Sequence, residues 1–362
     1  MNTDPYYGDL NGTYSRVIAD SIAENGIRLS TIELQAHRFV LSELNTHRVF
    51  SRNSASSRAI PVWKNLQQVI ENPAMPLSWG KEQSGMQAGE ELTGERLAEV
   101  QDLWRTAAAN AVSVVRQLTA TTKPGPAGEE LPVDALHKSV ANRLLEPFLW
   151  HKVIVTATDW EGFFEQRISP LAQAEIRVPA ELTAEAMYAS EPVFLGANEW
   201  HLPYVGDDDL SIVEAIAQIA NTGGHTIEDL QPMLARISAA RCARVSYLTH
   251  DGKRSIDADL ELYDRLVSAA PAHWSPLEHV ARPVDRGALV RGNFRGWVQL
   301  RHDADPYLPQ HHIISATHAM LRDLGRQIEA LQDSIGLEGG HVTEMRDMLT
   351  TFERLTADKA AA

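Results

Sequence analysis

Strand-like and helix-like segments alternate along this chain, and that alternation limits the kind of fold it can adopt. In residues 26–34 (GIRLSTIEL), Ile27, Leu29 and Ile32 nearly alternate with polar residues, which is typical of a strand. Residues 91–120 form a long amphipathic segment with helical periodicity. Because both kinds of segment recur, the sequence predicts a mixed α/β (α+β) protein.

The same reasoning places the remaining elements. Helices are expected over residues 36–48, 133–146, 163–189, about 210–221, about 257–269 and from Pro309 onward. Residues 149–160 (LWHKVIVTATDW) are interpreted as a buried strand or the start of an apolar helix, and residues 240–248 as strand-like. Residues 72–90, rich in proline and glycine, are expected to form a loop.

The proline-rich, glycine-rich and acidic stretch at 190–210 is the best internal boundary. We therefore expect a first region over 1–189, a second over 190–308 and a helical C-terminal tail over 309–362.

Composition restricts the expected cellular location of the protein and the disulfide and metal sites it can contain. The chain has 362 residues, of which 44% are hydrophobic, and this is enough for a substantial core. No apolar run approaches the ~20 residues needed to cross a bilayer, and the start MNTDPYYGDLNG lacks the features of a secretory signal. We expect a cytoplasmic protein without a membrane partner. The single cysteine, Cys242, excludes an intrachain disulfide and a multi-cysteine zinc site, and we predict no metal centre.

The charge balance is acidic, with one basic exception. A formal net charge of −15 argues against a nucleic-acid partner, which requires an extended basic face. Yet no acidic residue lies between Glu43 and Glu71, while that interval contains Arg48, Arg52, Arg58 and Lys64. Such a patch suits a nucleotide or another small phosphate, because each phosphate oxygen accepts charge-assisted hydrogen bonds. A solvated polar loop is the alternative that these residues leave open.

The basic patch also contains an ordered motif, H-R-x-x-S-x-N-x-x-S-x-R. Six positions match within twelve residues. This order resembles the hallmark motif of the flavin-dependent thymidylate synthases. The matching residues are His47, Arg48, Ser51, Asn53, Ser56 and Arg58.

A second resemblance lies downstream. Residues 141–148 (ANRLLEPF) and 163–177 (FFEQRISPLAQAEIR) resemble the part of that family that lines the nucleotide site. By position, Arg143 and Arg167 match the arginines that contact the phosphate and the base.

A third resemblance is displaced along the chain. Residues 243–247 (ARVSY) and 275–279 (SPLEH) resemble elements that precede the first motif in the family, but here they follow it by about 200 residues. The resemblance therefore implies a permuted or partly duplicated fold. Within SPLEH, the spacing of Ser275, Pro276 and Glu278 predicts a capping box, whose free N–H groups would suit a flavin phosphate.

The resemblance implies a fold like that of the flavin-dependent thymidylate synthases, with added helical segments and permuted motif order. It implies methylation of dUMP to dTMP, with FAD as cofactor and NADPH and methylenetetrahydrofolate as co-substrates. It also implies a homo-oligomer such as a tetramer, with active sites where subunits meet. The implied nucleotide contacts are Ser56, Arg58, Arg143 and Arg167, of which Ser56, Arg143 and Arg167 are the catalytic candidates. The implied flavin and folate contacts are His47, Arg48, Ser51, Asn53, Ser246 and His279.

Departures from the family pattern leave alternatives open. The family has an arginine at the position of Thr46, an acidic residue at Ser54 and an aromatic residue at Ala59. The substrate could therefore be dCMP, or the product a 5-hydroxymethyl nucleotide. Residues 156–164 (TATDWEGFF) lack the asparagine and arginine that contact flavin in the family, and Asn293 and Arg295 are candidates to replace them. A non-catalytic nucleotide-binding protein is the third alternative.

Overall fold

The computed structural model describes residues 6–8, 12–124, 126, 129–210, 227–247, 255–284 and 292–303. Residues 1–301 form one compact unit. In the second unit, residues 302–362, the structure describes only the last two residues of a short helix.

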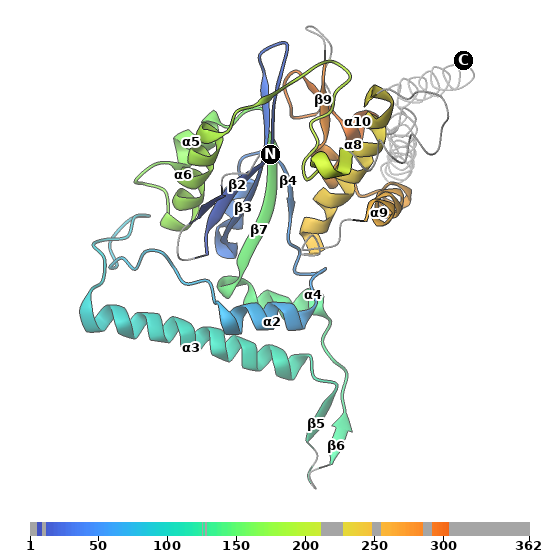
Figure 1. Ribbon diagram of the computed structural model, residues 1–362. Coiled ribbons are helices and arrows are strands. Elements are labelled where there is room, and N and C mark those ends of the chain that lie inside the picture. Colours follow the sequence, from blue (N-terminus) through green and yellow to red (C-terminus); the bar gives the residue numbers. More distant parts are fainter. Residues whose placement is uncertain are drawn as a thin grey trace, which may run out of the picture. The chain divides into compact units, whose positions relative to one another are not determined.

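The protein is mixed α/β, as the alternation of segments predicted (Figure 1). Among the described residues, the largest sheet has six strands. All neighbouring strands are antiparallel except β2 and β8, which are parallel. The central strand β3 is buried on both faces, which explains why its apolar residues alternate imperfectly. The strand order is β1 (Tyr6–Gly8), β2 (Tyr14–Ala23), β3 (Arg28–His37), β7 (Trp150–Ala157) and β4 (Ser51–Ser54), and β8 (Val193–Leu195) pairs with β2.

One face of this sheet is apolar and packs against two helices, α5 (Glu161–Arg167) and α6 (Ala174–Ala189). Alternate residues of β3 and β7 point to this face and bury their side chains. The resulting core includes Ile32, Leu34, Val153, Val155, Phe163, Ile176 and Ala180. This cluster follows directly from the hydrophobic pattern of the sequence.

The opposite face carries polar side chains that are nevertheless buried. Thr31, Thr156 and Ser51 are register partners in one row across β3, β7 and β4, and each is at most 1% exposed. This face is covered by the segment around His201 and by residues near His279, which contact Thr31 and Thr156 respectively. A buried polar row needs internal hydrogen bonds, because water cannot reach it.

A second apolar cluster joins the helices that connect β4 to β7. It is built from α2 (Val62–Glu71), α3 (Gly94–Leu118), α4 (Lys138–Ala141) and the 3₁₀ helix η2 (Asn142–Phe148). Figure 1 shows α2 lying along α3. A short hairpin of β5 (Thr122–Pro124) and β6 (Glu130–Pro132) follows α3.

The segments beyond residue 226 complete the polar side of the sheet. They comprise α8 (Ile227–Arg244), η3 (Val245–Tyr247), α9 (Ile256–Ser268), η4 (Ser275–Glu278), β9 (Ala281–Pro283), β10 (Trp297–Gln299) and α10 (Leu300–Asp303). β9 and β10 form an antiparallel ribbon. Trp297 is fully buried and packs with Leu29 of β3.

Several predicted elements are confirmed. These are the strand over 26–34, the loop over 72–90, the helix over 91–120, the buried-strand alternative for 149–160 and the helix near 257–269. The helices expected at about 210–221 and from Pro309 onward lie outside the described residues.

Other predicted elements are wrong, and each has a physical reason. The helix expected over 36–48 begins only after β3 has ended at His37, because β3 pairs with β7 from Ser30 to His37. It consists of η1 (Arg38–Val40) and α1 (Leu41–Asn45). The helix expected over 163–189 is two helices, broken near Pro170, since the residue before a proline disfavours helix. The helix expected over 133–146 begins only at Lys138, as α4, and continues from Asn142 as η2, which contains Pro147.

The strand expected over 240–248 is instead the end of α8 followed by η3. Its fully buried Cys242 and Val245 are three residues apart, which is a helical spacing. Within the part of the chain that the structure describes, no helix combines the length and apolar character that crossing a bilayer requires.

Candidate functional site

The basic segment 46–59 leaves α1, forms strand β4 and ends in a turn. Strand alternation directs Ser51 and Asn53 to the polar face of the sheet, because their register partners are Thr156 and Ile154. Ser51 is 1% and Asn53 is 7% exposed. The basic segment is therefore partly a strand, and its motif side chains contact residues far along the sequence.

Ser51 forms a three-residue cluster with Asn293 and Gln299. Asn293 Nδ2 donates to Ser51 Oγ at 3.1 Å, and Gln299 Nε2 donates to the same oxygen at 2.9 Å. Gln299 Nε2 also reaches Asn293 Oδ1 at 3.0 Å. Asn293 Nδ2 further donates to the carbonyl of Val49 at 2.8 Å, so the segment around Asn293 is held against the start of β4.

Asn53 and Ser56 connect the same strand to the other displaced segments. Asn53 Nδ2 donates to the carbonyl of Cys242 at 2.7 Å, and Ser275 Oγ donates to Asn53 Oδ1 at 3.3 Å. The backbone N–H of Ser56 donates to the carbonyl of Ser246 at 3.1 Å. Segments resembling separate family motifs thus form one hydrogen-bonded region, although Asn53 and Ser275 are 222 residues apart.

His279 belongs to a buried chain of hydrogen bonds that crosses the polar face. Its Nδ1 lies 2.7 Å from Thr156 Oγ1, which lies 2.6 Å from Thr31 Oγ1. Thr31 Oγ1 is 2.7 Å from His201 Nε2, and His201 Nδ1 is 2.8 Å from Ser21 Oγ. Side chains from β2, β3 and β7 are therefore linked to both histidines.

Both histidines of this chain are neutral near neutral pH. Burial and, to a smaller extent, the neighbouring His201 lower the pKa of His279 to about 3. Burial likewise lowers the pKa of His201 to about 3. Nε2 of His279 is buried and has no hydrogen-bond partner among the described residues. His279 therefore presents one unassigned ring nitrogen next to the motif strand.

Arg167 and His47 are in direct contact at the end of α1. Arg167 Nε donates to His47 Nε2 at 3.0 Å, and Arg167 Nη2 donates to Thr46 Oγ1 at 2.9 Å. Burial, followed by the charges of Arg167 and Arg52, lowers the pKa of His47 to about 4. His47 is therefore neutral, accepts through Nε2 and carries its proton on Nδ1.

Arg143 also lies near α1, but it contacts Glu146 and not His47. Its Nη1 donates to Glu146 Oε1 at 2.8 Å, and Arg38 Nε donates to the same oxygen at 3.1 Å. Ser57 Oγ also donates to Glu146 Oε1. The turn after β4 is thus tied to a cleft of about 500 Å³ that Arg38, Arg143, Glu146 and residues of α1 line. No hydrogen bond or ion pair among the described residues joins Arg143 to Arg167.

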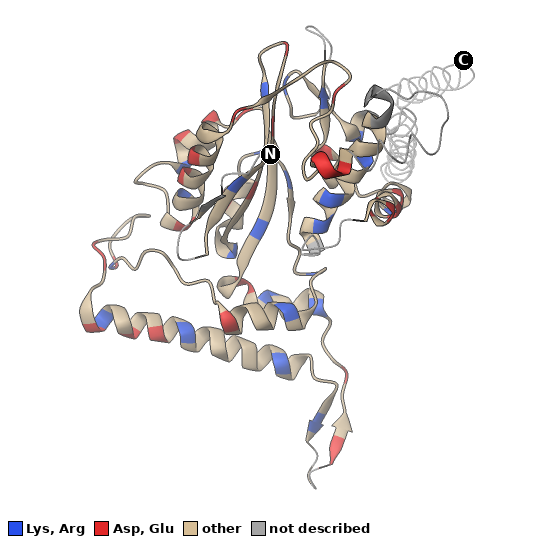
Figure 2. Ribbon diagram, viewed as in Figure 1, with Lys and Arg blue, Asp and Glu red and all other residues tan. Residues whose placement is uncertain are grey.

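The remaining arginines of the predicted site are exposed. Arg48 and Arg58 make no hydrogen bond or ion pair within the described parts of the chain. The side chain of Arg295 is 70% exposed and lies 3.6 Å from Asp159, while its backbone N–H donates to Thr158 Oγ1 at 3.1 Å. β4 and α2, which border the turn containing Arg58, each carry a further basic residue (Figure 2).

The capping box predicted for residues 275–279 is wrong. η4 is a single 3₁₀ turn of four residues that begins after Trp274, and no side chain caps it. Ser275 instead donates its hydroxyl to Asn53. The predicted helix N-terminus for a flavin phosphate is therefore not formed by this segment.

Sequence reasoning missed three residues that organise the site: Arg38, His201 and Gln299. None of the three matches a position of the motifs in the sequence. A recognisable signal was present only on the strands, where Thr31, Thr156 and Ser51 place hydroxyl groups at inward positions. Their partners come from distant segments, so no local pattern identifies them.

Chemically, the region offers guanidinium groups, amides, hydroxyls and neutral imidazoles. Cys242 is fully buried, and burial raises the pKa of its thiol, so it is unsuited to act as a nucleophile.

Neither a search with models of protein families nor a search of curated proteins finds a match for this sequence. A function for this chain must therefore be argued from its own residues and contacts.

Proposed function

We propose that this protein is a flavin-dependent pyrimidine nucleotide methyltransferase of the thymidylate synthase type, which converts dUMP to dTMP. The observation that carries this proposal is the set of hydrogen bonds from Ser51, Asn53 and Ser56 to the segments at 242–246, 275 and 293–299. In a permuted member of the family, the displaced motifs must lie next to the first motif in space. The hydrogen bonds between these segments support the proposal that the chain is such a member. Methylenetetrahydrofolate would supply the carbon and NADPH the reducing equivalents.

The nucleotide would be held by Ser56, Arg58, Arg143 and Arg167. The cleft that Arg143 lines, at about 500 Å³, falls within the ~300–1,000 Å³ typical of small-molecule sites. Ser57 connects the turn containing Ser56 and Arg58 to this cleft through Glu146. Guanidinium groups placed there would stabilise negative charge on the phosphate and on the activated base. Subunits of a homo-oligomer, such as a tetramer, would complete the site.

The residues around Asn293 suit the pyrophosphate of FAD. Arg48 directly precedes Val49, whose carbonyl binds Asn293, and Arg295 lies two residues beyond Asn293. Both guanidinium groups are exposed and can donate several charge-assisted hydrogen bonds. Ser51 and Gln299 orient Asn293, and Thr156 orients the neutral His279. When bound, the flavin would supply the redox chemistry and carry the one-carbon unit.

The test is the visible spectrum of the purified full-length protein followed by a product assay. We expect a flavin absorbance band, either as purified or after FAD is added. Incubation with labelled methylenetetrahydrofolate and NADPH should convert dUMP to dTMP. A parallel reaction with dCMP, and identification of methyl or hydroxymethyl product, separates the alternatives that Thr46, Ser54 and Ala59 leave open. Bound flavin without any modified nucleotide would refute the proposed reaction.

Replacing Arg58 by alanine should weaken dUMP binding and leave FAD binding largely intact. Losing a hydrogen bond to a charged group costs about 1.5–3 kcal/mol, or roughly 10- to 150-fold in affinity. Arg58 makes no ion pair among the described residues, so its removal should not disturb the fold. Calorimetric titration with dUMP measures the effect, with the exposed Arg116→Ala on α3 as a matched control. Unchanged dUMP affinity in Arg58→Ala would remove this residue from the nucleotide site.

A non-catalytic nucleotide-binding protein is the second candidate, and one observation favours it. Ser51, Asn53 and His279 are buried and already hydrogen-bonded to other parts of the chain, so they are less available to a flavin. A protein that stays colourless after FAD is added, yet binds dUMP through Arg58, would establish this candidate instead.

A further inference from the structure

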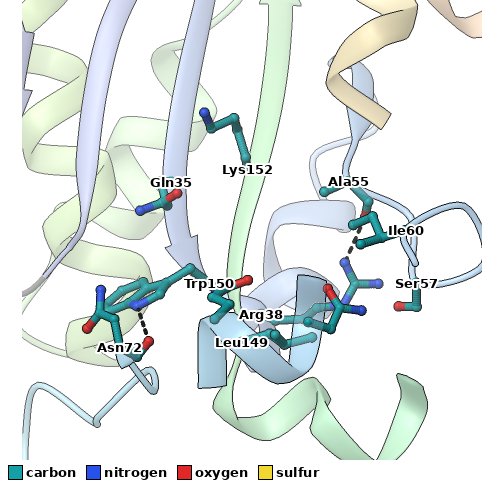
Figure 3. A pocket seen from close by; sticks show the side chains of 11 residues that line it. Gln35, Arg38, Ala55, Ser57, Ile60, Asn72, Leu149, Trp150 and Lys152 are labelled. Atoms are coloured by element: carbon teal, nitrogen blue, oxygen red, sulfur yellow. Dashed lines mark hydrogen bonds between the residues drawn. The ribbon is translucent and has the colours of Figure 1, made fainter. Parts of the chain in front are cut away.

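A second and smaller pocket lies between α2 and the ends of β3 and β7. Its volume is about 190 Å³. Figure 3 shows the side chains of Gln35, Arg38, Trp150 and Lys152 around this space. None of these four residues belongs to the motifs that resemble the thymidylate synthases.

Helix α2 presents amide side chains to this pocket, beside the apolar stripe of Val62, Leu66 and Val69 that packs in the second core cluster. Asn65 and Gln68 line the pocket three residues apart, on one side of the helix, and Asn72, which follows the end of α2, lines it as well. The inward side of a surface helix is normally a hydrophobic stripe. Gln35 of β3 adds a fourth carboxamide to the lining. Asn65 is the buried member of this set, Gln35 and Gln68 are half-buried and Asn72 is exposed, so the lining is polar from its buried wall to its rim.

Asn65 carries a donor that the protein leaves unsatisfied. The residue is 2% exposed, and its Nδ2 has no hydrogen-bond partner among the described residues. A buried donor without an acceptor costs about 1–3 kcal/mol, so native proteins normally satisfy it. The missing partner is an acceptor atom, because an amide nitrogen only donates.

The charged side chains of the pocket lining are both cations. They are Arg38 and Lys152, and no carboxylate lines the pocket. Glu146, which pairs with Arg38, lines the neighbouring cleft instead. Arg38 also donates from Nη1 to the carbonyl of Ala55 at 2.9 Å and to His151 Nδ1 at 2.8 Å. These bonds and the ion pair with Glu146 fix the guanidinium at the wall and leave one of its five N–H groups unassigned.

We propose that this pocket binds a small oxyanion, a phosphate or a carboxylate group. Arg38 and Lys152 would supply the positive charge, and Asn65 Nδ2 would donate to an oxygen of the anion. The volume lies below the ~300–1,000 Å³ of sites for larger ligands, so a whole dinucleotide such as FAD does not fit. The site is therefore distinct from the proposed nucleotide and flavin sites, although Arg38 lines both this pocket and the larger cleft.

The test is calorimetric titration of the full-length protein with sodium phosphate and, separately, with sodium acetate, at constant ionic strength maintained with sodium chloride. We expect saturable binding of at least one of the two anions, and the one that saturates identifies the group recognised. Asn65→Leu, which removes the donor at similar size, should weaken this binding by at least about tenfold. Gln67→Leu on the exposed side of the same helix should leave it unchanged.

Two further variants keep the result decisive. Lys152→Met should also weaken binding, which covers the case in which Asn65→Leu fails to fold. Arg58→Ala should bind phosphate or acetate as the unmodified protein does, so a loss of dUMP binding and a loss of oxyanion binding are separable. Three results would overturn the proposal: no saturable binding of either anion, binding by both Asn65→Leu and Lys152→Met that equals that of the unmodified protein, or a loss seen only in Arg58→Ala.

Discussion

Replacing Arg241 by methionine is expected to lower the free energy of unfolding by about 3–5 kcal/mol, because it removes the buried guanidinium that pairs with both Asp209 and Asp259. Arg241 Nη1 and Nη2 donate to Asp209 at 2.7 and 2.9 Å, and Nε donates to Asp259 at 2.8 Å. The side chains of Arg241, Asp209 and Asp259 are each at most 5% exposed. Urea unfolding followed by circular dichroism measures the loss.

Arg244→Met is the matched control for this prediction. Arg244 pairs only with Asp259 and is 23% exposed, so its removal leaves Asp259 paired with Arg241 and should cost clearly less. Neutralising the carboxylates in Arg241→Met with Asp209→Asn and Asp259→Asn should recover part of the lost stability. Equal losses for Arg241→Met and Arg244→Met would show that burial of the charge does not determine the effect.

Mild acid is expected to unfold the protein through its buried histidines. His151, His201 and His279 are fully buried and neutral, and burial lowers the pKa of each to about 3. In the unfolded chain each has a pKa near 6.5, so the unfolded state binds more protons between these values. Stability is therefore complete above about pH 6.5 and falls as the pH drops toward about 3. Each histidine costs about 1.4 kcal/mol per pH unit in this window, and the three together about 4.

Unfolding by urea at a series of pH values measures how steeply the free energy of unfolding falls with pH. A single variant shows how much of this slope His279 contributes. His279→Gln keeps an amide near Thr156 but cannot take up the proton, so it should remove about one third of the slope that these three histidines contribute between pH 6 and pH 5. His273→Gln, at an exposed position, should leave the slope unchanged. A slope that His279→Gln does not alter would show that His279 is not buried and neutral in the folded protein.

Much of the fold was predictable from local patterns. The strand containing Ile32, the helix over 91–120 and the helix near 257–269 were recognisable because hydrophobic periodicity reflects burial on one side of an element. The errors arose where tertiary contacts override local preference. β3 continues to His37 because β7 offers hydrogen-bond partners along its length, and residues 240–244 stay helical because Asp209 and Asp259 bind Arg241.

The candidate site likewise has features that the sequence predicts and features that depend on tertiary contacts. By itself the sequence determined the residue types of the motifs, their spacing, and the absence of acidic side chains from the basic patch. Only the tertiary structure decided which of these side chains are occupied by internal hydrogen bonds, such as Ser51 and Asn53, and which remain exposed, such as Arg58. It also revealed the pocket of Arg38 and Asn65, which no motif contains. The physical reason is that a hydrogen bond or a pocket depends on groups brought together from distant positions, and local periodicity carries no record of such partners.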